Sequence, residues 1–274
     1  YEMKVTKFSG EQVDYQQEKL IRSLKKSGAE DHVVSEILQQ IEPQLYDGIS
    51  SKKIYKLAFQ YLKNYSNVTA ARYNLKSAMV ALGPAGFYFE KYISKIHELL
   101  GYKTQINLTF DGKCVSHEVD VLLLKADVVT MMECKFHSGI EAKTDVKVPM
   151  YILSRFNDLK ERKYNLFGQL RLINSCLIVT NNKFTEDALS FAKCSDLKML
   201  SWDYPPKNGL REIIDRLKIY PITCLTTLTL NEKEQLLVAN IITVKDLLAE
   251  KNWLEKLQLS SIRIKRVLTE ANQL

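Results

Sequence analysis

Two carboxylates and a lysine stand in neighbouring apolar runs, and their types suit metal-assisted chemistry on a phosphate. Asp120 lies inside the apolar run 119–124, and Glu133 and Lys135 close the next run, which starts at residue 128. In a β-strand, side chains at i and i+2 point to the same face, so Glu133 and Lys135 share a face while Cys134 points to the other. A hairpin between the two strands would bring Asp120 beside them.

This charged group predicts a binding site. Two carboxylates and an ammonium on one sheet face are costly unless they bind something. Carboxylates are ligands for a hard divalent cation such as Mg²⁺. The lysine can orient or deprotonate an attacking water and stabilise the charge that develops on a phosphate. The alternative for Asp120, Glu133 and Lys135 is a surface ion pair on an edge hairpin.

The surrounding segment, 84–209, predicts a mixed α/β sheet domain. Pro84 can open a helix whose apolar stripe ends at Gly101. Asp111 and Gly112 form a strong hairpin signal between the first two strands that we expect. The expected elements after the first helix are strands at 104–110, 116–124 and 128–136, a helix at 146–163, a strand at 175–180, a helix at 185–194 and a strand at 197–201, which gives the order αβββαβαβ.

These residues and their setting resemble the Mrr-like branch of the PD-(D/E)xK restriction endonuclease superfamily. Asp120, Glu133 and Lys135 match the family motif, with Val119 in place of its proline, and 179–188 resembles the segment that links a core strand to a helix. Glu90 matches a helical glutamate that often completes the metal site. The resemblance implies a restriction-endonuclease-like core in which Glu90, Asp120 and Glu133 hold Mg²⁺ and Lys135 positions the attacking water. For Glu90 alone, a solvated helix face is an equal alternative.

Five further side chains near the motif are candidates for contacts with DNA or the metal. Lys143, Lys147 and Arg155 follow the core strand and could bind DNA phosphates, or they could be solvated helix charges. His117 and His137 flank the motif and could touch a phosphate or the metal. The reading we favour for both histidines is an ordinary surface or hydrogen-bonded side chain.

Residues 1–83 predict a short strand followed by helices. The strand is expected at 5–8, with a turn at Ser9-Gly10, and Ser50 is a good N-cap for the third helix. The expected helices cover 15–26, 31–41, a stretch from 50 and a stretch from 67.

This segment resembles the ATP-cone, a regulatory nucleotide-binding domain. The resemblance depends on Val5-x-Lys7, the Gly10 turn, an aromatic at Tyr15, Lys19 and the helix order, together with Ile49-Ser50 and Ala70-Ala71-Arg72-Tyr73. It implies that Lys7 and Lys19 hold the triphosphate of ATP or dATP. Phe8 replaces a second basic residue of the family, so a helical domain that binds nothing is the alternative. The chain has no G-x-x-x-x-G-K-[ST] pattern, so we do not expect ATP hydrolysis as the main activity.

Residues 210–274 predict a small all-helical C-terminal domain. Helices are expected at 231–239, 243–250 and 261–271, and 241–248 resembles a helix-hairpin-helix or SAM-like module. Such modules bind DNA backbones or mediate protein contacts. The glycine hairpin of the DNA-binding form is missing, so a partner or packing role stays open.

The charge and the cysteines set limits on partners and location. The net charge of +7 is spread as +3, +2 and +2 over 1–83, 84–209 and 210–274, so a site for a polyanion must be assembled by folding. The five cysteines form no C-x-x-C pair, which favours buried thiols in the cytoplasm. No apolar run approaches the length of a membrane span.

Together these patterns predict an α/β protein in three parts, an ATP-cone at 1–83, a nuclease core at 84–209 and a helical domain at 210–274. The expected function is Mg²⁺-dependent hydrolysis of DNA, regulated by ATP or dATP. One alternative is a DNA-repair nuclease for branched substrates, and another is a nucleotide-responsive DNA-binding regulator with an inactive nuclease fold. The expected partners are DNA and ATP or dATP, without a membrane, and a homo-oligomer stays open.

Overall fold

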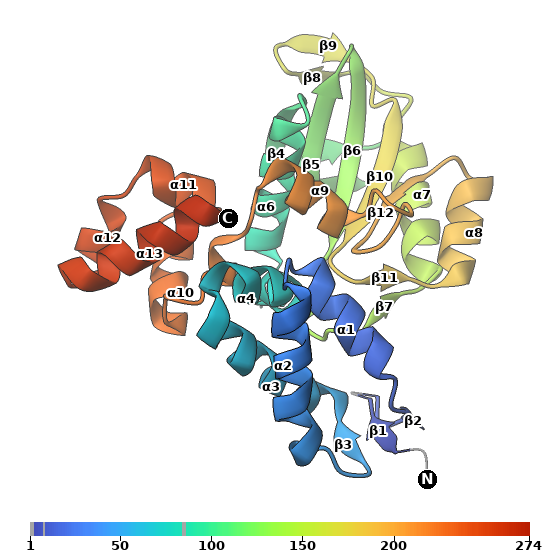
Figure 1. Ribbon diagram of the computed structural model, residues 1–274. Helices are drawn as coiled ribbons and strands as arrows, with labels where there is room; N and C mark the ends of the chain where they lie inside the picture. The colour runs from blue at the N-terminus through green and yellow to red at the C-terminus, as the bar shows by residue number, and fades with distance from the viewer. Residues whose placement is uncertain (1–2, 8, 84–85) are drawn as a thin grey trace. The chain divides into compact units, whose positions relative to one another are not determined.

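The computed structural model describes residues 3–7, 9–83 and 86–274 (Figure 1). The chain divides into two compact units, one formed by residues 1–78 with 222–274 and the other by 79–221. Phe8, at the end of the predicted first strand, and Pro84, at the start of a predicted helix, lie outside the described residues. No helix in the described parts of the chain is long and apolar enough to cross a bilayer.

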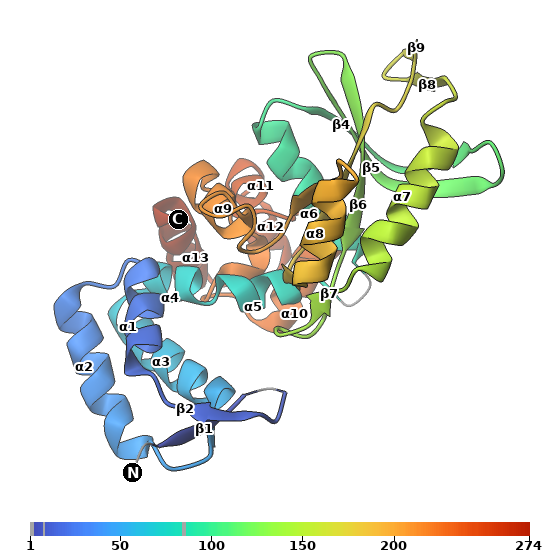
Figure 2. The same ribbon diagram turned by 90° about the vertical axis from the view of Figure 1, so that its right-hand side faces the viewer.

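The N-terminal part of the first unit combines a small sheet with helices (Figure 2). The sheet has the order β2-β1-β3, in which β1 pairs antiparallel with β2 and parallel with β3. Ser50 caps its helix as predicted, because its side chain accepts a hydrogen bond from the backbone N–H of Lys53. The elements are β1 (Lys4–Thr6), β2 (Gln12–Asp14), α1 (Gln17–Lys26), α2 (Asp31–Ile41), a 3-10 turn (Glu42–Gln44), β3 (Ile49–Ser50), α3 (Ser51–Tyr65), α4 (Asn67–Tyr73) and α5 (Leu75–Val80).

The C-terminal part of the first unit is helical, as the sequence predicts. Capping boxes at Thr229 and Thr243 start two of its helices. The buried carboxylate of Glu270 accepts hydrogen bonds from the backbone N–H groups and hydroxyls of Thr226 and Thr227. The elements are a 3-10 turn (Ile222–Cys224), α10 (Leu230–Val238), α11 (Val244–Ala249), α12 (Trp253–Lys256) and α13 (Ser261–Gln273), of which α12 was not predicted.

The second unit contains a five-stranded mixed sheet with the order β12-β10-β6-β5-β4. Strands β4, β5 and β6 are antiparallel neighbours, and β6, β10 and β12 run parallel. The main elements follow the predicted order: α6 (Phe87–Leu99), β4 (Lys103–Asp111), β5 (Ser116–Lys125), β6 (Val128–Lys135), α7 (Lys147–Leu159), β10 (Ser175–Thr180), α8 (Glu186–Cys194) and β12 (Lys198–Leu200). The sequence did not predict β7 (Lys143–Thr144), which pairs with β11 (Lys183–Phe184), or the pair β8 (Tyr164–Leu166) and β9 (Gln169–Arg171). Helix α9 (Leu210–Leu217) also belongs to this unit.

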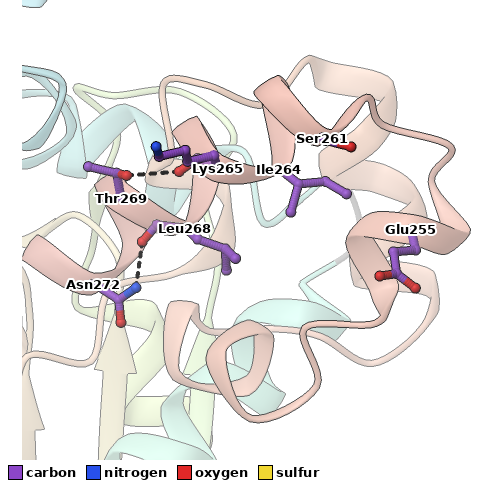
Figure 3. A pocket seen from close by; sticks show the side chains of 7 residues that line it. All are labelled: Glu255, Ser261, Ile264, Lys265, Leu268, Thr269 and Asn272. Atoms are coloured by element: carbon purple, nitrogen blue, oxygen red, sulfur yellow. Dashed lines mark hydrogen bonds between the residues drawn. The ribbon is translucent and has the colours of Figure 1, made fainter.

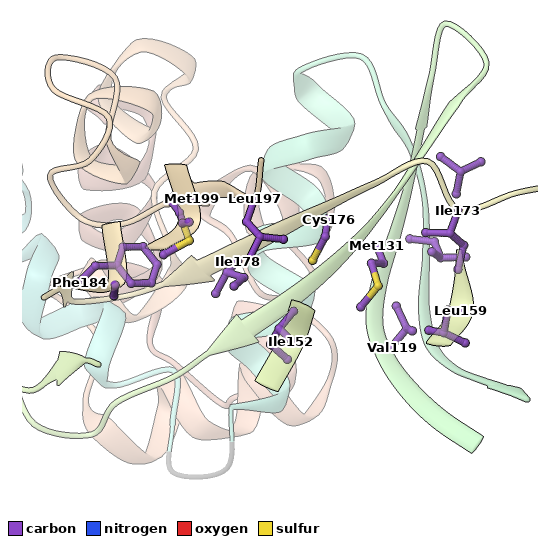
Figure 4. Packing of buried hydrophobic residues seen from close by; sticks show 14 of the residues in the cluster. Val119, Met131, Ile152, Leu159, Ile173, Cys176, Ile178, Phe184, Leu197 and Met199 are labelled. Atoms are coloured by element: carbon purple, nitrogen blue, oxygen red, sulfur yellow. The ribbon is translucent and has the colours of Figure 1, made fainter. Parts of the chain in front are cut away.

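One hydrophobic cluster of the second unit lies between the sheet and helices α7 and α8. Figure 4 shows Ile152 and Leu159 of α7 in one cluster with Val119 and Met131 of the sheet. Met131 and Glu133 stand two positions apart in β6 and so share a face. The apolar face of β6 therefore continues into charged residues near the end of the strand.

All five cysteines are free thiols. Cys134, Cys176 and Cys224 are buried, whereas Cys114 and Cys194 are exposed, so burial is less general than the sequence predicts. Burial raises the pKa of the Cys176 thiol to about 12. The buried thiols therefore remain protonated at neutral pH, as expected for packing residues.

Candidate functional site

Three carboxylates from different elements of the second unit influence one another, and we call Glu90, Asp120 and Glu133 the acidic cluster. Burial, followed by the charge of Asp120, raises the pKa of Glu90 to about 7. The same two causes, with a further contribution from Glu90, raise the pKa of Glu133 to about 7. Burial also raises the pKa of Asp120. Helix α6, strand β5 and strand β6 thus place the three carboxylates near enough to affect one another's ionisation.

The backbone pairing of β5 with β6 stops just before Asp120, which leaves a local opening in the sheet. The β5–β6 pairing ends at Val121 and Met132, one position before Asp120 would face Glu133. The Asp120 Oδ2 instead accepts a hydrogen bond of 2.7 Å from the backbone N–H of Cys134. On the other side, Asn107 in β4 stands at the register position opposite Asp120 with φ of 55°, in the left-handed region. A side chain therefore replaces the regular backbone pairing at this point.

Lys135 lies at the end of β6, two positions after Glu133, and its side chain is exposed. Its positive charge favours the ionised forms and so lowers the pKa values of both Asp120 and Glu133, against the effect of burial. Lys135 therefore lies close enough to Asp120 and Glu133 to affect the ionisation of both carboxylates. The exposed ammonium can reach a ligand from solvent while it remains close to the acidic cluster.

Arg155 of α7 is the basic residue most closely tied to the acidic cluster. Its Nη1 donates to Oε2 of Glu133 at 2.8 Å and to the carbonyl of Glu118 at 3.0 Å. The side chains of Arg155 and Glu133 are only 13% and 14% exposed. The sequence suggested a DNA phosphate contact for Arg155, whereas the structure places its guanidinium on Glu133. The separation of the two residues along the chain gives no local signal for this pair.

The ion pair bears directly on metal binding. Within 3–7, 9–83 and 86–274, no three His, Cys, Asp or Glu side chains are grouped to hold a metal ion as they stand. Magnesium, however, is often held by only one or two carboxylates together with water and substrate phosphates. Asp120 and Glu133 suit that donor set, provided that Glu133 is released from Arg155.

Breaking the ion pair from one side should destabilise the protein. We expect Arg155→Met to lower the free energy of unfolding by about 3 kcal/mol, because it leaves a nearly buried carboxylate without its partner. Lys183→Met is the matched control, since Lys183 pairs with Asp203 and the two side chains are 49% and 47% exposed. Its expected cost is about 0–1 kcal/mol. Chemical denaturation measures both, and equal losses for the two variants would contradict the assignment.

The raised pKa values predict that acid stabilises the metal-free protein. The folded state holds the Glu90 and Glu133 protons more tightly than the unfolded chain, whose glutamates titrate near 4.5. The resulting stability is therefore present below about pH 4.5 and is lost as the pH rises through about 7. Allowing for solvent screening at Glu90, we expect a loss on the order of 1 kcal/mol per group. Thermal melts of wild type and Glu90→Gln in a chelator at pH 5.5 and 8 test this, and identical pH dependence in both would contradict it.

Lys143 lies in β7, and Lys147 is the first residue of α7. Both side chains are exposed. In the described parts of the chain neither forms an ion pair. They remain available for the phosphate contacts that the sequence predicts.

The two flanking histidines are held by hydrogen bonds within the fold. His117 Nε2 lies 2.8 Å from Oδ2 of Asp158. Burial alone would raise the pKa of Asp158, but hydrogen bonds from His117 and from backbone N–H groups hold it at about 2. His137 Nε2 lies 2.8 Å from the hydroxyl of Thr144, and its backbone N–H donates to Asn181. Both histidines are thus ordinary hydrogen-bonded side chains, which is the interpretation that the sequence favours.

The nucleotide-binding candidates lie in the first unit. Lys19 is exposed on α1. The Lys7 ammonium is 2.8 Å from the carboxylate of Glu11, and the two side chains are 38% and 61% exposed. An anion at Lys7 would therefore compete with a solvent-exposed ion pair, which is a weak interaction.

The helical C-terminal part carries a hollow of about 450 Å³ (Figure 3). Two of its polar side chains are already used within α13, where Thr269 donates to the carbonyl of Lys265 and Asn272 to that of Leu268. Glu255, Ser261 and Lys265 are the other polar side chains of its lining. The hollow is lined by Glu255, Ser261, Ile264, Lys265, Leu268, Thr269 and Asn272.

Both ends of the chain match known families. Residues 3–76 match the ATP cone domain, which confirms the N-terminal resemblance. Residues 220–274 match the family described as AF1548-like, C-terminal.

Relatives cover a larger part of the chain. An uncharacterized protein from Archaeoglobus fulgidus is 30% identical over 182 residues, which make up 66% of this chain and 98% of the relative. The crystal structure of AF1548, a protein of unknown function, is 28% identical, covers 68% of this chain and 96% of its own, and has a TM-score of 0.55. The structure of Can2 from Sulfobacillus thermosulfidooxidans, solved with cyclic tetra-adenylate, is 13% identical, covers 73% of this chain and 55% of its own, and has a TM-score of only 0.34.

Proposed function

Given that this chain belongs to the AF1548-like family, we propose that it is a metal-dependent endodeoxyribonuclease whose activity responds to a nucleotide at its ATP cone. The observation that carries the proposal is the acidic cluster with the Lys135 ammonium beside it at the end of β6. Asp120 and Glu133 on antiparallel strands, followed by a lysine two positions later, keep the arrangement of the PD-(D/E)xK motif. We take the cytoplasm as the location, since all five cysteines are free thiols.

In the proposed reaction, the oxygen of water attacks the phosphorus of a DNA phosphodiester and one P–O ester bond breaks. The products are a phosphate monoester end and a hydroxyl end, whose oxygen takes up a proton as it leaves. Asp120 and Glu133 would hold Mg²⁺, with Glu90 as a further ligand. The ion would neutralise negative charge on the phosphate. Lys135 positions the attacking water and stabilises the charge that develops on the phosphate oxygens. Lys143 and Lys147 bind neighbouring phosphates and so fix the strand in the site.

Nucleotide binding would act through Lys7 and Lys19. The triphosphate of ATP or dATP would replace Glu11 as the partner of Lys7. Regulation could follow through oligomeric state or through access of DNA to the site, since one chain carries both modules.

Plasmid cleavage in Mg²⁺ tests the proposal. We expect the wild-type protein to cleave DNA with Mg²⁺ and not with chelator, and the rate to change when ATP or dATP is titrated. Parallel substrates, namely linear, branched and methylated duplexes, distinguish restriction from repair. If the cleavage rate and the oligomeric state stay unchanged across both titrations, the proposed regulation by nucleotide is wrong. Absence of cleavage on every substrate would remove the nuclease part.

One observation favours a second function, a nucleotide-responsive DNA-binding regulator with an inactive nuclease fold. Glu133 is already paired with Arg155, and the described carboxylates do not form a three-ligand group. A regulator would bind DNA without cutting it in Mg²⁺, Mn²⁺ or Ca²⁺. Gel-shift and cleavage assays on the same fragments decide between the two functions.

A further inference from the structure

Helix α7 presents an exposed aromatic ring next to the acidic cluster. Tyr151 is 59% exposed, although tyrosine rings are usually at least half covered in folded proteins. It stands one helical turn before Arg155, and Nη2 of Arg155 donates to the Tyr151 hydroxyl at 2.9 Å. The guanidinium carbon lies over the ring, 4.9 Å from its centre. The phenol group is thus hydrogen-bonded while much of the ring remains open to solvent.

The ring is also held in a fixed place relative to the acidic cluster. The same guanidinium that contacts Tyr151 is bound to Glu133 and to the carbonyl of Glu118. In the metal-free form, a continuous set of contacts therefore runs from Glu133 to an exposed aromatic side chain. A side chain that is already fixed before binding loses less conformational entropy when the ligand binds. Such an arrangement suits recognition better than packing, because the ring contributes little to the apolar core.

The basic residue Lys147 lies one turn before Tyr151 on α7. Residues at i, i+4 and i+8 lie along one face of a helix, so Lys147, Tyr151 and Arg155 form a row. The row combines an exposed ammonium, an exposed ring and a guanidinium that contacts the acidic cluster. Alternation of cations with aromatic rings is the pattern by which proteins bind single-stranded nucleic acids.

We propose that Tyr151 stacks on an unpaired base next to the phosphate that is cleaved, so that the preferred substrate contains a single-stranded segment. This inference deepens the proposed function and rests on it for the identity of the phosphate. In a continuous duplex, both faces of each internal base are covered by neighbouring bases, so the ring of Tyr151 finds no free face. In a single strand, a gap or a flap, a base face is available.

Binding in chelator, where no cleavage occurs, tests the stacking directly with the full chain. The probes are a 20-nucleotide single strand with 2-aminopurine at successive positions and the blunt duplex of the same sequence. We expect Tyr151→Ala to weaken single-strand binding by about 10-fold, which corresponds to about 1.4 kcal/mol, and to change duplex binding less than twofold. Quenching of one 2-aminopurine position in wild type should be lost in the variant.

Two further variants separate stacking from other effects. Tyr151→Phe keeps the ring and loses only the hydroxyl contact to Arg155, so it should bind like wild type. Tyr46→Ala removes an exposed tyrosine of the first unit, 52% exposed, and should also bind like wild type. Unchanged single-strand binding by Tyr151→Ala, or an equal loss on single strand and duplex, would overturn the inference. Failure of the nuclease proposal would show separately, as intact binding by wild type without cleavage in Mg²⁺.

Discussion

Replacing Lys135 by alanine should reduce Mg²⁺-dependent DNA cleavage by at least 100-fold and leave DNA binding within a few-fold of wild type. The ammonium lies beside Asp120 and Glu133 but is exposed, so its removal deletes a positioned donor without opening a cavity in the core. Loss of one such donor to a developing charge typically costs a factor of 100 to 1,000 in rate. Single-turnover cleavage of a labelled duplex gives the rate, and a gel shift in Ca²⁺ gives the binding.

The matched control is Lys193→Ala, which removes an exposed lysine from the last turn of α8. It should cleave at the wild-type rate. Lys135→Arg keeps the charge but changes the donor geometry, and it should recover only part of the activity. Wild-type cleavage by Lys135→Ala would contradict the proposed chemistry and favour a different site for any nuclease activity.

Asp120→Asn should reduce the rate of DNA cleavage by about 1,000-fold or more. Its melting temperature should equal or exceed that of the wild type. The amide oxygen of asparagine can still accept the hydrogen bond from the Cys134 N–H, so the opening of the sheet is preserved. The variant removes the negative charge that contributes to the raised pKa values of Glu90 and Glu133. In the proposed metal site, the same substitution should therefore remove a metal ligand and relieve the repulsion among the carboxylates of the metal-free form. Calorimetric melts in chelator and cleavage in Mg²⁺ measure the two effects.

Two other variants separate the loss of charge at Asp120 from a loss of stability. Asp120→Ala also leaves the Cys134 N–H without its acceptor, and we expect an additional loss of about 1–3 kcal/mol in the free energy of unfolding. Asp127→Asn changes an exposed aspartate of the β5–β6 turn and should affect neither activity nor melting by a comparable amount. A marked drop in the melting temperature of Asp120→Asn would show that the carboxylate serves mainly to stabilise the fold.

Local patterns account for most of the sheet domain. The apolar runs of β5 and β6 and the Asp111-Gly112 turn predict the antiparallel strands, and the i, i+2 rule places Glu133 and Lys135 on one face. The helix ends are also local, because caps such as Ser50 are read from neighbouring residues. Short elements such as β7 and β11, each of two residues, carry no apolar run and gain their pairing only when distant segments meet.

The ion pair at the site could not be predicted in the same way. Arg155 meets Glu133 only because α7 packs on the face of the sheet that contains Met131, and no spacing in the sequence encodes that packing. The carboxylate of Glu270 is a similar case, since it accepts four hydrogen bonds from Thr226 and Thr227, far away in the chain. In the sequence alone, a charged residue that forms a tertiary hydrogen-bond network cannot be distinguished from a charged residue on a solvated surface.

The left-handed conformation of Asn107 has a consequence for the behaviour of the chain in a crowded solution. Strand β4 is nine residues long and forms one edge of the five-stranded sheet, and among the described strands only β5 pairs with it. A straight edge of that length is a template on which strands of other molecules can add and start aggregates. The reversed φ at Asn107 interrupts the regular geometry of this edge near its middle, and asparagine tolerates that conformation better than the β-branched residues that favour strands. We therefore expect the irregularity opposite Asp120 to make this edge a poorer template for edge-to-edge aggregation.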